Sequence, residues 1–293
     1  VRTLKPDCYR AKDMGFPLKG YVYCYPGQAN YLGGDILSGL AATEIYKQEE
    51  ISVFLDIGTN GELVIGNKDF LVAGAGAAGP ALEGGVVKTG MRAEPGAVDR
   101  VHIENGQVKI HVIGETRAKG ICGSGIVDLL AEMFLNGWID VRGRYVEEAS
   151  EKIREVEGEL AAEYAPGLFF FQKDIEEFLK TKAAAGTMVE YMMGEVGLEM
   201  KDIGRFYVAG AFGTHISKEA GVTVGLYPDM PRDKIILPGN SSLIGARKML
   251  LNRKLKEEME EILDKMTYIQ FGAVDNFLYI MVAAEAIPHT DIR

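Results

Sequence analysis

A carboxylate followed by a glycine turn is the first place in this chain where residue types and spacing suit chemistry. Asp56 ends the buried apolar run 52–55 and is followed by a turn that contains Gly58, Thr59, Asn60, Gly61 and Glu62. Backbone N–H groups on such a turn, with the Thr59 hydroxyl, can bind a phosphate, and Asp56 is placed to hold Mg²⁺ or its waters. The alternative is an ordinary β-hairpin with a capping aspartate, because Asn-Gly is a strong hairpin signal.

Two later loops leave apolar strands through small residues. The first contains Gly210, Ala211, Phe212 and Gly213, and the second contains Gly239 and Asn240. A base or ribose can lie against the first loop, and the second opens a helix whose free N–H groups favour an anion. Glycine is also common at strand–helix junctions for packing reasons alone, so each loop by itself is only weak evidence for a ligand site.

Three further positions are candidates between the first turn and these loops. Glu83 lies in a glycine- and alanine-rich stretch and can orient a water for attack on a phosphate ester, and Arg92 can offset phosphate charge. The alternative is an exposed acid with a surface partner. Gly123 and Ser124 follow Cys122 at a predicted helix start, which can bind an anion or carry a reactive thiolate. The alternative there is a buried cysteine and a serine that only caps the helix.

The elements that must position these residues follow from changes in hydrophobic period. Strands are expected at 52–55, 62–65, 70–73, 101–103, 108–112 and 206–209. Helices are expected at 36–46, 124–134, 174–193, 241–251 and 254–266. A β-meander followed by alternating helices and strands is typical of an α/β fold, here a mixed β-sheet flanked by helices.

Composition excludes several classes of protein. Lys and Arg number 32 against 42 Asp and Glu, a net charge of −10, which disfavours a surface that wraps nucleic acid or binds an anionic membrane. No apolar run approaches the roughly 20 residues of a membrane-spanning helix, and no signal peptide is recognisable. The three cysteines, Cys8, Cys24 and Cys122, form no CxxC pair, so a disulfide framework or cysteine-bound cluster is not expected. We expect a cytoplasmic protein.

Taken together, the motifs form a specific ordered set. They are Asp56–Glu62, Ala78–Gly84, Gly90–Ala93, Gly120–Gly125, Ala209–Gly213, Pro238–Asn240 and Ile287–Asp291. From about Gly33 to the C-terminus, the chain resembles the C-terminal ATPase domain of the reductive activators of corrinoid proteins. Those proteins belong to the superfamily of acetate and sugar kinases, heat-shock chaperones and actin.

This resemblance implies an actin-like fold of two ribonuclease-H-like lobes with ATP and Mg²⁺ between them. It implies a weak ATPase that docks on a corrinoid protein and supports reduction of Co(II) to Co(I) in a methyltransferase system, with the electron supplied by an iron–sulfur domain. Asp56–Glu62 would be the second phosphate loop, Ala209–Gly213 the adenosine loop, and Gly239-Asn240 part of the closing contact. A homodimer is left open.

Two departures from the family pattern shape the expected domain organisation. The iron–sulfur cysteines are not present, and only one Asp-x-Gly-Thr turn occurs. The chain is therefore expected to be a fragment with the end of a first lobe or connector at 1–50, a second lobe at 51–252 and a C-terminal helical return segment at 253–293. The second lobe is expected to carry a helical insert around 138–173. The iron–sulfur cluster would lie in a missing N-terminal domain. A chain that holds only one of the two phosphate loops should bind ATP weakly.

Two other functions remain compatible with the residues. A docking module that ignores nucleotide would explain the single phosphate loop. A small-molecule kinase of the same superfamily would share the turns but needs a base in an acceptor pocket, for which Glu83 is the available candidate.

Overall fold

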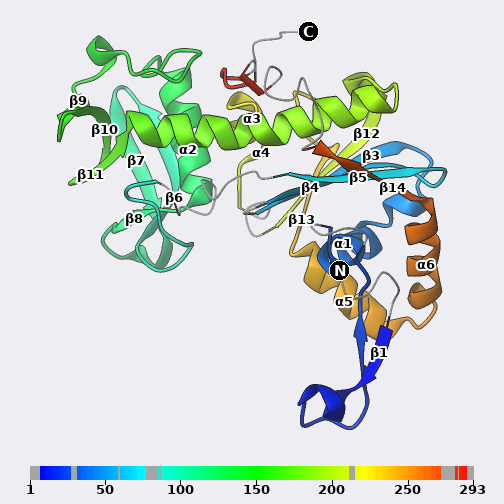
Figure 1. Cartoon of the computed structure of the whole chain (residues 1–293). Helices are drawn as coiled ribbons and strands as arrows, with labels where there is room; N and C mark the ends of the chain where they lie inside the picture. Colours follow the sequence, from blue (N-terminus) through cyan, green and yellow to red (C-terminus); the bar gives the residue numbers. More distant parts are fainter. Residues whose placement is uncertain are drawn as a thin grey trace.

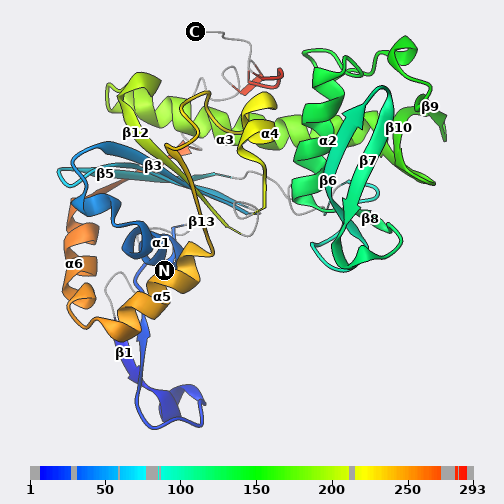
Figure 2. The ribbon, with the colours of Figure 1, turned by 180° about the vertical axis from the view of Figure 1, so that it is seen from behind.

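The chain folds into a sheet lobe and an insert subdomain, and one long helix, α3 (Gln172–Glu195), runs along both (Figure 1). This computed structural model describes residues 7–27, 32–58, 60–76, 85, 87–210, 215–271, 281–282 and 284–288. Figure 2 shows the same two bodies from behind, with α3 running along both. No helix in the described ranges is long and apolar enough to cross a membrane.

The sheet lobe is built on a mixed sheet. In the described residues its strands are β3 (Ile51–Ile57), β4 (Gly61–Gly66), β5 (Leu71–Gly76), β12 (Ile203–Ala209), β13 (Ile235–Gly239) and β14 (Met266–Gln270). Their order is β13-β12-β3-β4-β5-β14. The β3-β4-β5 meander is antiparallel, whereas β12 runs parallel to β3, β13 to β12 and β14 to β5. This is the α/β topology of the ribonuclease-H-like lobe that the sequence predicts.

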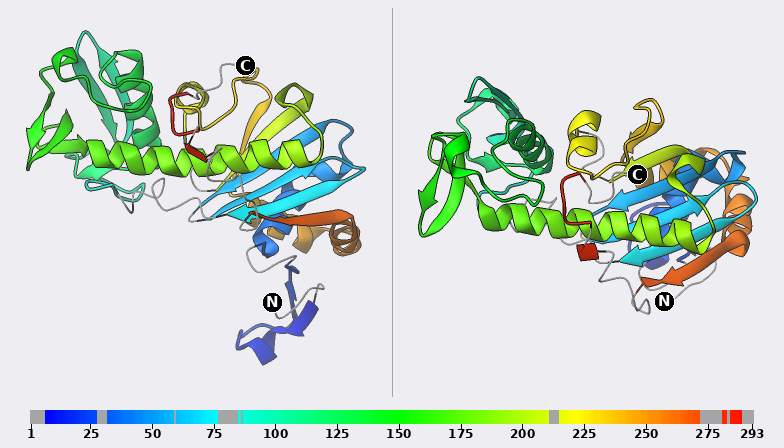
Figure 3. Two further views of the ribbon diagram at one scale, coloured as in Figure 1. Left: turned by 45° about the horizontal axis from the view of Figure 1, so that its top comes forward. Right: turned by 90° about the horizontal axis from the view of Figure 1, so that it is seen from above.

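Both faces of this sheet are buried, which explains why β3 is an almost continuous apolar run. Successive side chains of a strand point to opposite faces. Val53 and Leu55 belong to the core that includes α3, and Phe54 belongs to the core on the other face. Figure 3 shows α3 across one face of the sheet, and α1, α5 and α6 cover the other.

Helices α1 and α5 pack unusually closely beneath the sheet. The helices of this face are α1 (Gly34–Thr43), α5 (Ser241–Leu251) and α6 (Leu255–Lys265). A Cβ on Gly245 would lie 1.8 Å from the Ser38 carbonyl oxygen, so only glycine permits this approach. The Ser38 hydroxyl donates to the Ser242 carbonyl at 2.6 Å, and the Tyr25 hydroxyl donates to the Gly245 carbonyl at 3.0 Å.

The insert subdomain differs from the sequence expectation. It contains β6 (Ala97–Glu104), β7 (Gln107–Val112), β8 (Gly120–Ile121), α2 (Gly123–Leu135), β9 (Ile153–Val156), β10 (Glu159–Ala165) and β11 (Leu168–Phe171). The expected helical insert around 138–173 is instead a three-stranded antiparallel sheet, β11-β10-β9. Positive φ angles at Glu157 and Gly158 make the first of its turns a tight hairpin, which a helix would not allow.

The ends of the chain complete the architecture. The N-terminal part contains β1 (Asp7–Arg10) and β2 (Tyr21–Cys24). Between the larger elements lie α4 (Lys218–Thr223) and short 3₁₀ turns at Ala11–Met14, Ile45–Lys47, Ile113–Glu115, Glu147–Ala149 and Met200–Asp202. The β1-β2 hairpin projects away from the sheet lobe beneath α5 (Figure 1). Within the expected helical return at 253–293, α6 is followed directly by a strand, because β14 joins the sheet beside β5.

Candidate functional site

The carboxyl ends of three parallel strands meet in one row. Asp56 on β3 is in register with Ala209 on β12, and Ala209 is in register with Gly239 on β13. Each strand is followed by one of the three loops that the sequence singles out. In open α/β sheets, ligands bind outside the carboxyl ends of parallel strands. The fold therefore brings residues far apart in the chain to one edge of the sheet, which we call the strand-end row.

The loop after β12 lies directly against the Asp56 carboxylate. Gly210 has a φ of +97°, and a Cβ built there would lie 2.8 Å from Asp56 Oδ1 and 2.8 Å from the Ile57 carbonyl oxygen. Any side chain at this position would collide with the carboxylate and strain the backbone. Gly210 is thus required for the close approach of the predicted adenosine loop to the predicted phosphate loop.

A second carboxylate faces Asp56 across the hairpin. Glu62 on β4 is paired directly with Asp56, so both side chains lie on the same face of the sheet. Burial raises the pKa of Asp56 to about 6, and the negative charge of Asp35 adds to that rise. Burial likewise raises the pKa of Glu62 to about 7, and the negative charges of Asp35 and Asp56 add to that rise. The site is a partly dehydrated pair of acids.

Asp35 is a residue of this site that the sequence argument did not assign. It lies in the first turn of α1, directly after Gly33 and Gly34, and its side chain is exposed. Its charge acts on both Asp56 and Glu62. The signal available in the sequence is the Gly-Gly-Asp run at 33–35, immediately before the apolar helical pattern at 36–46, and by itself it indicates only a helix start.

The turn between β3 and β4 is tighter than a free phosphate loop. The Gly58 amide donates to the Asn60 carbonyl at 2.9 Å, so this N–H group is already engaged. Gly61 is buried as the first residue of β4, and Asn60 is exposed at the tip. Thr59 lies outside the described residues. Phosphate binding by the Gly58 amide would therefore require this turn to open.

Gly239 and Asn240 form the junction from β13 to α5. Gly239 has a φ of +73°, and Asn240 is the N-cap of α5, where its Oδ1 accepts a hydrogen bond from the Leu243 amide at 2.9 Å. The predicted helix start is present, and the Asn240 side-chain oxygen is used to cap it. Asn240 itself is exposed at the row.

The remaining predicted residues divide into two groups. Glu83, Ala211, Phe212 and Gly213 lie outside the described residues. Arg92 is exposed near the insert subdomain, and Gly123 and Ser124 are buried at the N-terminus of α2. The expectation that Ser124 caps α2 is wrong, because the helix begins at Gly123 and the N-cap is Cys122. Ser124 Oγ instead lies 3.4 Å from Cys122 Sγ.

The donor set at the strand-end row suits a hard divalent cation. Carboxylate oxygens are ligands that Mg²⁺ prefers, and Mg²⁺ is usually bound by one or two carboxylates together with phosphates and water. Asp56 and Glu62 are surrounded by like charge, and their pKa values are raised, so a cation would relieve their repulsion. Among the described residues, no group of three or more His, Cys, Asp or Glu is arranged to hold a metal by itself. Asp56 and Glu62 can contribute carboxylate oxygens to a Mg²⁺ ion whose other ligands are phosphate oxygens and water.

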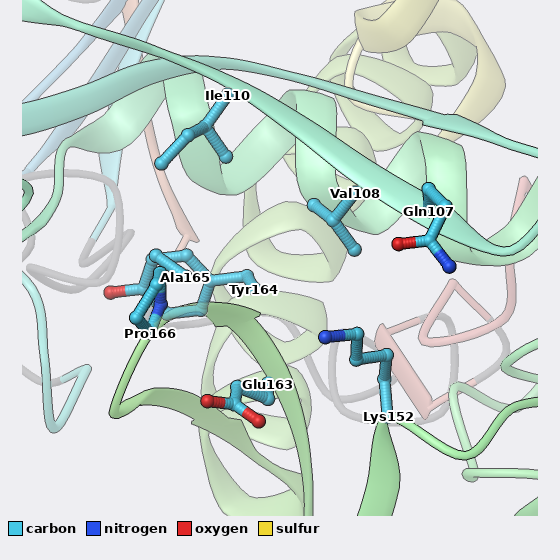
Figure 4. Close-up of a pocket in the computed structure, with 8 residues that line it drawn as sticks. All are labelled: Gln107, Val108, Ile110, Lys152, Glu163, Tyr164, Ala165 and Pro166. Atoms are coloured by element: carbon cyan, nitrogen blue, oxygen red, sulfur yellow. The ribbon is translucent and has the colours of Figure 1, made fainter.

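A separate hollow lies in the insert subdomain. Its volume is about 260 Å³, and it lies between β7 and β10 (Figure 4). Val108, Ile110 and Ala165 supply apolar walls, and the Lys152 side chain extends into it. Glu163 at its rim is already engaged by Arg154 and by the Gly167 amide. None of the predicted site residues lines this hollow.

The strand order of the mixed sheet defines an actin-like α/β domain, the fold shared by the acetate and sugar kinases, heat-shock chaperones and actin. More particularly, residues 50–293 match the family described as the C-terminal domain of RACo, the ASKHA domain. The chain belongs to this family.

Named relatives agree with this assignment. The chain is 31% identical over 268 residues to the "Corrinoid activation enzyme RamQ" of Eubacterium limosum, covering 85% of this chain and 45% of the relative. It is 29% identical over 265 residues to the "[Co(II) methylated amine-specific corrinoid protein] reductase" of Methanosarcina barkeri, covering 83% of this chain and 46% of the relative.

A solved structure shows the same fold. The "Reductive activator for corrinoid,iron-sulfur protein" superposes with a TM-score of 0.91 at 40% sequence identity, over 99% of this chain and 48% of that chain. The present chain thus spans about half the length of each of these three relatives.

Proposed function

We propose that this chain is the nucleotide-binding part of an ATP-dependent reductive activator of corrinoid proteins. The observation that carries the proposal is the strand-end row, where Gly210 packs on the Asp56 carboxylate and Glu62 pairs with Asp56. The names of the relatives supply the context of corrinoid reduction. The names do not favour a small-molecule kinase.

The residues of the row have distinct roles in this proposal. Asp56 holds Mg²⁺ or its waters beside the phosphates, and Glu62 acts with Asp56 on the same side of the sheet. Mg²⁺ would supply charge neutralisation on the phosphate oxygens. Gly210 allows the following loop to approach, and Gly239 with Asn240 closes the row from the α5 side. Glu83 remains the proposed residue for orienting the attacking water.

The partner is proposed from the same relatives. ATP binding and turnover at this row would support return of a Co(II) corrinoid to Co(I), with the electron supplied by an iron–sulfur cluster held outside the residues of this chain. A corrinoid protein is the proposed partner. Arg92, which is exposed, is the residue proposed to contact an anion or the partner, whereas Gly123 and Ser124 are buried.

Calorimetric titration of Mg·ATP into the full-length polypeptide tests the nucleotide proposal. The wild type should bind, and Asp56→Asn should weaken binding by about tenfold or more, because the change removes a charged ligand from the cation. Asp69→Asn is the matched control, since Asp69 lies exposed on the turn between β4 and β5 at the opposite end of the same meander. Equal ATP affinity in wild type and Asp56→Asn would rule out the assigned role of Asp56.

Binding experiments on the same full-length protein distinguish the nucleotide-binding proposal from the alternative of a docking module. A corrinoid protein that binds equally tightly with and without Mg·ATP, while the wild type binds no nucleotide, would favour a docking module. Binding or turnover that requires Mg·ATP would exclude that alternative.

A further inference from the structure

A lysine is buried near the middle of α3. Lys182 is 2% exposed, whereas lysine side chains are almost never fully buried unless they are paired. Its ammonium donates hydrogen bonds to the carbonyl oxygens of Ala286 and Pro288, the second at 2.6 Å. The acceptors lie more than a hundred residues further along the chain. Lys182 therefore fixes the described end of the chain onto α3.

The segment 284–288, which we call the C-terminal strap, also contacts two other elements. Ile287 is 1% exposed, and its amide donates to the Val141 carbonyl at 2.8 Å. On the opposite side, Gly225 has a φ of +73°, and a Cβ built there would lie 1.8 Å from the Pro288 carbonyl oxygen. The strap is thus enclosed between Lys182, Val141 and Gly225.

These contacts belong to different bodies of the molecule. Val141 lies in the turn after α2 in the insert subdomain, and Gly143 of that turn packs on Leu179 of α3. Gly225 follows α4, which connects β12 to β13 of the sheet lobe, comes after the loop that begins at Gly210, and also contacts α2. Figure 3 shows the strap, in red, crossing α3 beside α4, between the insert and the sheet. Lys182 lies where α3 passes from one body to the other.

The buried ammonium of Lys182 and the carbonyl groups of the strap depend on each other. A buried ammonium is unfavourable unless it is hydrogen-bonded, and two backbone carbonyls of one short segment supply that compensation here. Burial lowers the pKa of Lys182 to about 8, and the charge of Glu285 acts in the opposite direction. Release of the strap would leave both the ammonium and the two carbonyls without these partners, so attachment and burial depend on each other.

We infer that the C-terminal strap, pinned by Lys182, ties the insert subdomain to the sheet lobe and holds the turn that follows the Gly210 loop. The tie is a property of the chain's own packing. Its effect on nucleotide binding rests on the proposed function, because only then does the Gly210 loop meet a ligand.

Hydrogen exchange of the full-length protein tests the tie. Lys182→Met keeps length and removes the donors, so exchange in peptides covering 284–288, 139–143 and 221–227 should accelerate by about tenfold or more. Lys180→Met is the matched control, because Lys180 lies exposed on the same helix and pairs with Glu177 at 2.8 Å. The control should exchange like the wild type. Acceleration confined to 284–288, or none at all, would overturn the inference.

A second variant approaches the strap from the other side. Gly225→Ala places a methyl group against Pro288 and should accelerate exchange at 284–288 and 139–143 without altering Lys182. It carries the test if Lys182→Met does not fold. Where the wild type binds Mg·ATP, both variants should weaken binding, and unchanged affinity would overturn the coupling to the Gly210 loop. A wild type that binds no nucleotide would refute the proposed function while the exchange comparison still decides the tie.

Discussion

The acid pair at the strand-end row predicts an unusual dependence of stability on pH. The pKa of Asp56 is about 6 in the folded protein, against an ordinary value of 3.8. A folded-state pKa above the unfolded value means that the folded state binds the proton more tightly. The contribution of Asp56 to stability is therefore present below about pH 4 and is lost as pH rises through 6. The full difference corresponds to about 3 kcal/mol above both pKa values.

Asp56→Asn removes the titration and keeps the shape of the side chain. In the absence of Mg²⁺ and nucleotide, we expect the variant to be more stable than the wild type at pH 8 by up to about 3 kcal/mol, with the difference shrinking toward pH 4. The charge of Asp56 also raises the pKa of Glu62, so that pKa should fall in the variant. Urea unfolding across this pH range measures the first effect, and carboxyl NMR titration measures the second.

The response to magnesium completes this prediction. Mg²⁺ with ATP should stabilise the wild type and stabilise Asp56→Asn far less, since a ligand stabilises only the state that binds it. Asp69→Asn should follow the wild type throughout. A variant that is equally destabilised at pH 5 and pH 8, or that gains as much from Mg·ATP as the wild type, would refute the reasoning.

Three further predictions test the close contacts. Gly210→Ala should destabilise the fold by roughly 1–3 kcal/mol in urea unfolding, because φ is +97° at this position and the methyl group would collide with Asp56 Oδ1. A free energy of unfolding within about 0.5 kcal/mol of the wild type would contradict that contact. Gly245→Ala should lower the free energy of unfolding by on the order of 2 kcal/mol, because the methyl group forces α1 away from α5. Gly186→Ala, on an exposed part of α3 with open space around its Cβ, should instead raise the free energy of unfolding by up to about 1 kcal/mol. Equal effects of the two substitutions would contradict the close packing of α1 on α5. In native protein, the exposed Cys8 should react with a thiol reagent much faster than the buried Cys122, and mass spectrometry that finds both labelled together would contradict the placement of Cys122.

The strand-end row could be predicted largely from sequence, for a physical reason. Asp56 directly follows the buried run 52–55, and Asn60-Gly61 fixes a short hairpin whose register places Glu62 opposite Asp56. Parallel strands that end in small residues must bring their loops to the same edge. The sequence could not show that the Gly58 amide is engaged within the turn, because that depends on a particular hydrogen bond to Asn60.

The insert subdomain was predicted less well. The stretch 153–171 mixes charged and apolar residues, and its turns at Gly158 and Gly167 lack the Asn-Gly signal that identified the other hairpins. Asp35 was missed for a different reason. Its role depends on how α1 packs under the sheet, and local sequence shows only a helix start. The C-terminal strap likewise depends on Lys182, whose acceptors lie far along the chain.

The most direct measurement is a hydrogen-exchange footprint of Mg·ATP on the full-length protein. The strand ends at 56–62, 208–210 and 238–241 should become protected together at the same nucleotide concentration in the wild type and not in Asp56→Asn. Protection of one segment without the others, or none with saturating Mg·ATP, would contradict a single nucleotide site at the strand-end row.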